Sequence, residues 1–182
     1  MNIVTTPMCK KILDLAGIND YNIAVHPSKD GGDFAILLSE SKVDMDSLKI
    51  KLNTFKQIVE SVIKVSEYSN KKLDYEDVLS MLEDYTFANA WLSDNSKVKS
   101  LKDENSKINV SVKSKFLRDI VLDMNFNIDN DNFDYLIYPD YMEVDKNIDC
   151  SFISIPTHHN VPKNPIERAE LRYAILLNIS HY

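Results

Sequence analysis

Residues 2–17 read NIVTTPMCKKILDLAG, and this stretch predicts a strand, a turn and a helix in succession. Its first four residues are a short run rich in β-branched side chains, which favours a strand. Apolar residues then recur at helical spacing from Met8 to Leu15. Thr6 stands where an N-cap hydroxyl belongs, Pro7 where a helix begins and Gly17 where one ends.

Residues 33–39, Asp-Phe-Ala-Ile-Leu-Leu-Ser, form the apolar run expected of a strand that is covered on both faces. Residues 21–25 alternate weakly and predict another strand before it. Such an order is typical of layered packing in which a helix covers a sheet. We therefore expect an α/β or α+β fold, a single domain with a mixed sheet of about five strands. The remaining strand candidates are residues 108–112, 135–138 and 150–155.

Helical patterns fill the middle and the end of the chain. Residues 46–92 predict a helical hairpin, because apolar residues recur at steps of three and four and Asp74 is placed to cap the second helix. Residues 93–106 are polar and aperiodic, which predicts a mobile loop. Asn164 followed by Pro165 marks the start of a C-terminal helix.

Glycine is scarce, with 3 in 182 residues. Phosphate-binding loops need several glycines in one turn, and the pair Gly31 and Gly32 cannot supply them. We therefore expect no nucleotide-binding loop and no cofactor. The length, with 44% hydrophobic residues, suits one domain with a substantial core.

The charge and the cysteines predict the compartment and the partners. The formal net charge of −7 repels the backbone of DNA and RNA, so we expect no nucleic acid partner. Cys9 and Cys150 lie far apart in sequence, which fits reduced intracellular thiols. The first residues lack a signal-peptide pattern, and no apolar run is long enough for a membrane span. A soluble cytoplasmic protein with no membrane contact is expected.

The turn at Thr5 and Thr6 is the first candidate site. A helix N-terminus that follows a strand can bind an anion, and two hydroxyls could help to orient it; the alternative is that Thr6 is only a helix cap. Cys9 is a candidate nucleophile or metal ligand because the same helix end favours its thiolate, although a free cysteine is commonly a small buried hydrophobe.

Residues 155–162 are the second candidate, because a strand end there delivers His158 and His159 into a loop bracketed by prolines. Either histidine could act as a general acid, a general base or a ligand, or both could be exposed or capping residues. Adjacent histidines tend to point apart, so a metal ion would use one of them with distant donors. No recognised metal-ligand spacing is present, and we predict no metal site.

Arg168 and Arg172, two of the three arginines, fall four residues apart on one helical face. They could clamp a carboxylate or phosphate, or bridge to an acidic protein partner. The alternative is a salt-bridged exterior with Glu167 and Glu170.

Two further patterns lie between residues 129 and 141. The acidic stretch 129–134 resembles a calcium loop only superficially, since Phe133 occupies a ligand position. Tyrosines at positions 135, 138 and 141 fit either a docking surface or half-buried packing.

The opening stretch also resembles the first strand, turn and helix of the iron-chelate and corrinoid binding-protein superfamily. The resemblance covers residues 3–7 and 12–17. That superfamily implies an export signal, a much longer chain, and a second lobe joined by a long helix, none of which the sequence predicts. Openings of this kind recur in unrelated α/β proteins, so the resemblance assigns no family.

These patterns predict an intracellular, non-catalytic accessory or assembly protein that acts through protein–protein contacts in a larger complex. The alternative is a small-molecule binding protein or an enzyme that handles an anionic ligand, a phosphate or a carboxylate, at the Thr5–Thr6 turn. In that alternative His158 or His159 transfers a proton and Arg168 steadies charge. Enzymatic activity is left open, with a non-enzymatic role preferred.

Overall fold

The computed structural model describes residues 1–93, 95–157 and 161–181. Its strands form two parallel sheets of four strands each, which confirms the α/β class. The contacts divide the chain into two units. Residues 1–92 and 163–167 form the first, and residues 93–162 and 168–182 form the second. That the chain folds as a single domain stays a prediction.

The first sheet has the order β2-β1-β3-β4. Its strands are β1 (Ile3–Thr5), β2 (Tyr21–Ile23), β3 (Phe34–Leu38) and β4 (Ser47–Ile50). Gly32 lies two residues before β3, where a Cβ atom would stand only 2.8 Å from the carbonyl oxygen of Asn2. The close approach of the two backbones at β1 and β3 therefore requires glycine at this position.

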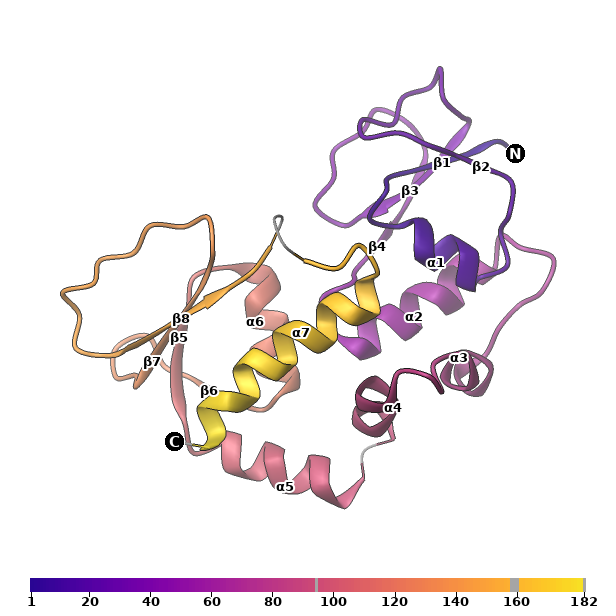
Figure 1. The fold of residues 1–182 in the computed structure, drawn as a ribbon. Coiled ribbons are helices and arrows are strands. Elements are labelled where there is room, and N and C mark those ends of the chain that lie inside the picture. The colour runs from indigo at the N-terminus through magenta and orange to yellow at the C-terminus, as the bar shows by residue number, and fades with distance from the viewer. Residues whose placement is uncertain (94, 158–160, 182) are drawn as a thin grey trace. The chain divides into compact units, whose positions relative to one another are not determined.

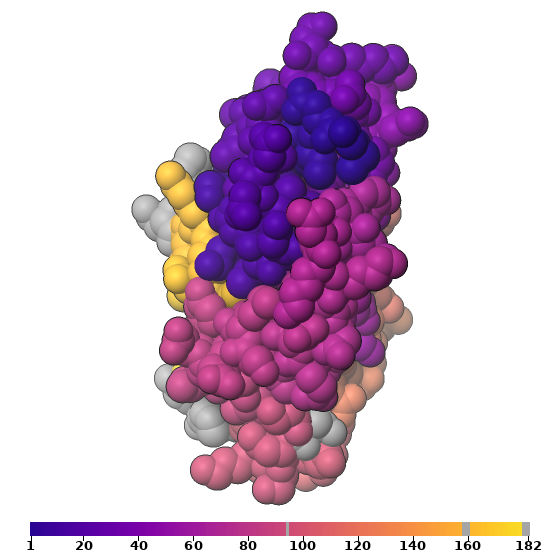
Figure 2. Space-filling model, turned by 90° about the vertical axis from the view of Figure 1, so that its right-hand side faces the viewer, coloured from indigo at the N-terminus to yellow at the C-terminus, as the bar shows by residue number. Residues whose placement is uncertain are grey.

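Helices α1 (Lys10–Leu15) and α2 (Phe55–Ser66) pack against each other beside the first sheet (Figure 1). The predicted end of α1 is confirmed, because Gly17 has a φ of 76° and the amide of Ile18 donates to Leu13 O at 3.0 Å. Figure 2 shows one face of this unit, where the N-terminal residues in indigo lie beside the helical residues in magenta.

The predicted hairpin at residues 46–92 is corrected at its start. Residues 47–50 form β4, and the helix begins only at Phe55, where the Thr54 hydroxyl accepts a hydrogen bond from the amide of Gln57 at 3.1 Å. The sequence pattern failed there because Leu48 lies one helical step from Leu52 and also two residues from Ile50, which is the spacing of a strand. The second helix divides into α3 (Tyr75–Met81) and α4 (Thr86–Leu92).

The second sheet has the order β6-β5-β7-β8, which repeats the strand order of the first. Its strands are β5 (Asn109–Val112), β6 (Asn127–Ile128), β7 (Tyr135–Pro139) and β8 (Ser151–Ile155). Helix α6 (Lys115–Asp123) follows β5 and contacts β6 and β7 (Figure 1). Helix α7 (Pro165–Leu177) continues into the 3-10 helix η1 (Asn178–His181).

Two parallel sheets therefore replace the expected single mixed sheet of about five strands. Strand pairing depends on hydrogen bonds between residues far apart in sequence, and the alternation within a strand does not reveal its neighbours. The repeated strand order is a feature of the backbone that the amino-acid sequence does not display as a repeat.

The expected mobile loop at residues 93–106 is also corrected, since residues 96–105 form helix α5 (Ser96–Asn105). The side chain of Asn95 caps this helix by accepting hydrogen bonds from the amides of Lys97 and Val98, each at 3.1 Å. Val98 and Asn105 are buried. A helix that buries so few apolar residues has almost no hydrophobic periodicity, which is why its sequence resembles a loop.

Candidate functional site

The site is built at the edge of the second sheet where β7 and β8 end. In a parallel sheet the carboxyl ends of the strands meet at one edge, and ligands of open α/β sheets commonly bind there. Asp140 directly follows β7, and Pro156 and Thr157 directly follow β8. The amide of Asp140 donates to Ile155 O at 2.9 Å, which joins the two strand ends.

Asp140 and Thr157 face each other across these strand ends. Thr157 is 5% exposed, and its hydroxyl donates a hydrogen bond to Oδ1 of Asp140. Asp140 itself is exposed. A buried hydroxyl thus orients a carboxylate that is accessible from solvent, which is an arrangement suited to ligand contact.

The two arginines of α7 lie close to this pair and are buried. Arg168 is 4% exposed and Arg172 is 6% exposed, so the expected salt-bridged exterior is wrong for both. Nη1 of Arg168 donates to Pro162 O at 3.3 Å, and Nε of Arg172 donates to Pro156 O at 3.2 Å. The Arg172 guanidinium also stands 5.0 Å from the ring centroid of Phe116.

Burial and the like charge of Arg168 disfavour the protonated form of Arg172. Burial is the main cause that lowers the pKa of its guanidinium to about 10, the charge of Arg168 contributes in the same direction, and Asp140 acts in the opposite direction. Two buried cations beside one carboxylate give this region a positive balance among these three groups. The two chemical features of the site are an oriented, exposed carboxylate and buried positive charge near it.

The candidate residues that the sequence predicted in the first unit, Thr5, Thr6 and Cys9, lie in a different sheet–helix unit from Asp140 and Thr157. Thr5 is fully buried, and its hydroxyl donates to Ile36 O at 2.7 Å. Thr6 is not the helix cap, because residues 6–9 make one further turn and Cys9 occupies the N-cap position without a side-chain cap bond. The Cys9 thiol is fully buried, 3.5 Å from the Thr6 hydroxyl. The ligand and nucleophile roles of these residues stay predictions.

His158 and His159 lie outside the described residues. Within residues 1–93, 95–157 and 161–181, no group of three or more His, Cys, Asp or Glu side chains is arranged to hold a metal ion. Among these residues Cys150 is a free thiol, and burial is the main cause that raises its pKa.

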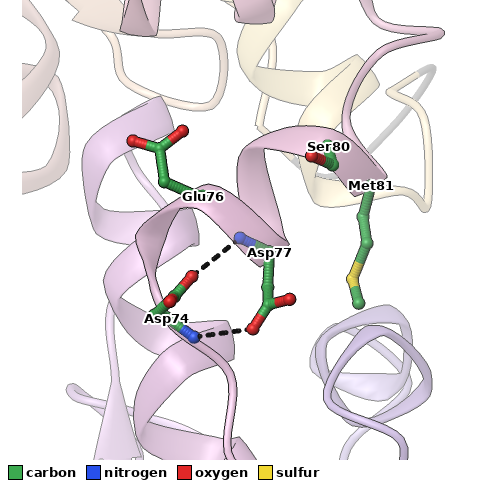
Figure 3. Close-up of a pocket in the computed structure, with 5 residues that line it drawn as sticks. All are labelled: Asp74, Glu76, Asp77, Ser80 and Met81. Carbon is green, nitrogen blue, oxygen red and sulfur yellow. Dashed lines mark hydrogen bonds between the residues drawn. The ribbon is translucent and has the colours of Figure 1, made fainter.

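A pocket of about 460 Å³ on α3 gathers Asp74, Glu76 and Asp77 with Ser80 and Met81. Figure 3 shows why two of these carboxylates meet: the Asp74 side chain accepts from the amide of Asp77 at 2.9 Å, and the Asp77 side chain accepts from the amide of Asp74 at 3.2 Å. Glu76 points away from this pair. The cluster is a reciprocal cap of the helix, so its acidity has a structural explanation.

The sequence reasoning missed Asp140 and Thr157. The available signal was their position, since each follows a predicted strand by one or two residues. The contact between them needed the parallel pairing of β7 with β8, which places Pro139 opposite Ile155.

Solved structures share the α/β architecture of this chain. The Mn-bound periplasmic metal binding protein from Candidatus Liberibacter asiaticus matches with a TM-score of 0.58 and 8% identity, over 99% of this chain and 100% of that one. Its Cd-bound form matches with a TM-score of 0.55, at the same identity and coverage. A Zn(II)-bound variant of AdcAII from Streptococcus pneumoniae matches with a TM-score of 0.58 and 12% identity, over 98% of each chain.

At the level of sequence, the model of the MJ0786 family C-terminal domain matches residues 105–182. This match covers most of the second unit, which holds Asp140, Thr157 and the two arginines. No curated protein matches the chain at a significant level.

These comparisons correct two expectations. The chain shares its fold with metal-bound proteins, which contradicts the expected accessory or assembly role in a larger complex. The neighbour from Candidatus Liberibacter asiaticus is a periplasmic protein, which contradicts the expected cytoplasmic location. Across the described part of the chain, no helix combines the length and the apolar character needed to cross a membrane.

Proposed function

We propose that the protein binds a small ligand, a divalent metal ion, at the carboxyl edge of the second sheet, with Asp140 as the contacting carboxylate. The observation that carries the proposal is the hydrogen bond from the buried Thr157 hydroxyl to this exposed carboxylate. The fold adds support, because its structural neighbours bind manganese, cadmium and zinc. Carboxylate oxygen is a ligand for manganese and zinc alike.

The orientation of the carboxylate matters for such a role. A metal-ligating carboxylate that is itself hydrogen-bonded loses less rotamer freedom when the ion arrives. Oδ1 of Asp140 accepts the bond from Thr157, and the Asp140 amide is fixed on Ile155 O. Both the backbone and the side chain of Asp140 are therefore held before a ligand arrives.

Isothermal titration of the purified protein with Mn²⁺ and with Zn²⁺ tests the proposal. We expect the wild type to bind one ion per chain. Asp140→Asn should weaken the affinity by about tenfold or more. Thr157→Val keeps the shape of the side chain but removes the hydrogen-bond donor, and it should weaken the affinity by about 10–100-fold. Asp103→Asn is the matched control, because Asp103 is an exposed aspartate on α5, a helix that contributes no residue to the site. Absence of binding to the wild type, or equal affinity in Asp140→Asn, would refute the proposal.

A small anion, a phosphate or a carboxylate, is the second candidate ligand. The observation that favours it is the buried pair of guanidinium groups, Arg168 and Arg172, with their positive balance. Titration with inorganic phosphate and with citrate distinguishes the two candidates. Anion binding that survives Asp140→Asn but is lost in Arg172→Met would favour the anion over the metal ion.

A further inference from the structure

We propose that Arg168 and Arg172 are positioning residues that hold the strand-end carbonyls and thereby fix the Asp140–Thr157 pair. The inference deepens the proposed function and rests on it for its effect on metal binding. We call the two arginines with the carbonyls of Pro156 and Pro162 the arginine clamp.

The clamp binds the backbone carbonyls of Pro156 and Pro162, which stand on either side of residues 157–161. Arg168 and Arg172 are four residues apart on α7, so their side chains leave the same side of the helix. One binds the carbonyl of Pro162 at 3.3 Å and the other binds the carbonyl of Pro156 at 3.2 Å. The helix is thereby joined to the chain on both flanks of a segment that follows β8.

A short chain of contacts leads from Arg172 to the carboxylate. Nε of Arg172 donates to Pro156 O, the next residue is Thr157, and its hydroxyl donates to Asp140. Rotation of the peptide between Pro156 and Thr157 would break the first bond and turn the threonine away from its acceptor. Arg172 thus acts on the ligand-facing group through one intervening residue.

The chemistry of the contact requires arginine. Nε belongs to a planar guanidinium, and the Phe116 ring, whose centroid lies 5.0 Å from Cζ of Arg172, helps to orient that plane. A lysine has a flexible ammonium group and no such plane. Burial and the charge of Arg168 lower the pKa of the Arg172 guanidinium, so placing this side chain in the interior carries a cost that a surface arginine does not have. The hydrogen bonds to the strand-end carbonyls offset that cost in part.

The variants Arg172→Lys and Arg172→Met test the clamp, with Arg118→Met as the matched control. Arg118 is the third arginine of the chain and is exposed on α6 in the same unit. The first variant keeps the charge and loses Nε, and the second loses both. We expect both to weaken Mn²⁺ binding by about 10–100-fold, as for other groups that orient metal ligands, while Arg118→Met stays within twofold of the wild type.

A second measurement reports the side-chain conformation of Thr157 in the absence of metal. Three-bond NMR couplings of Thr157 report its χ1 angle, which we expect to be a single rotamer in the wild type and in Arg118→Met and to be averaged in both Arg172 variants. Circular dichroism checks that each variant folds. Where Arg172→Met is unfolded, Arg172→Lys carries the test alone.

The outcomes separate the clamp from the metal proposal. Averaged couplings in Arg172→Lys with no metal binding by the wild type would support the clamp and overturn its role in metal binding. Unchanged couplings with unchanged affinity in a folded Arg172→Lys would overturn the clamp. Tighter Mn²⁺ binding in Arg172→Met would also overturn it, because the charge of Arg172 would then act only by repelling the cation.

Discussion

Replacement of Asn105 by alanine tests the finding that residues 96–105 are an ordered helix and not a mobile loop. Asn105 is fully buried at the end of α5, and its side-chain amide donates to Met124 O at 2.8 Å. That carbonyl lies at the C-terminal end of α6, and Met124 is also fully buried. The alanine variant leaves a buried acceptor without this donor.

The expected loss in the free energy of unfolding is about 2 kcal/mol, within the range of roughly 1–3 kcal/mol for a buried polar group left without a partner. For a chain of this length, such a loss lowers the melting temperature by about 4–8 °C. Urea unfolding followed by circular dichroism measures the first quantity and thermal unfolding the second. Ser106→Ala is the control, since its exposed hydroxyl bond to Asp103 O contributes no more than about 0.5 kcal/mol.

Hydrogen exchange supplies an independent reading of the same finding. Protection of the α5 amides should fall in Asn105→Ala and should match the wild type in Ser106→Ala. A stability within about 0.5 kcal/mol of the wild type, or wild-type α5 amides that exchange as fast as a free peptide, would refute the reasoning.

Three further changes are expected to alter stability. Gly32→Ala should lower the free energy of unfolding by about 1–3 kcal/mol, because the added Cβ would meet a backbone oxygen at 2.8 Å. In Gly31→Ala the nearest atom to the added Cβ is 3.5 Å away, so its free energy of unfolding, measured with urea, should stay near that of the wild type. Asp74→Ala removes the cap of α3 and should cost about 1 kcal/mol, measured in the same way. Tyr173→Phe removes the hydroxyl that donates to Oδ2 of Asp123 at 2.5 Å, and a loss of about 1.5–3 kcal/mol is expected; a melting temperature equal to that of the wild type would contradict this expectation.

The sequence alone determined the features that depend on neighbours within a few residues. Asp74 accepts from the amide three residues ahead, Gly17 takes the left-handed conformation after α1, and Asn164 accepts from the amide of Ile166 at 3.0 Å at the start of α7. Each is a contact within one helical turn, so the residue type and its position suffice to predict it. The α/β class followed in the same way from runs and periodicity.

The tertiary structure decided the strand partners and the candidate site. The Thr157 hydroxyl meets Asp140 across 17 residues only because β7 and β8 pair in parallel, and no local pattern encodes that pairing. The burial of Arg168 and Arg172 likewise depends on which elements cover α7, since an arginine-rich face reads the same in sequence whether it is solvated or packed. Local hydrogen bonds can be read from residue order, whereas burial and long-range pairing exist only once distant segments of the chain have met.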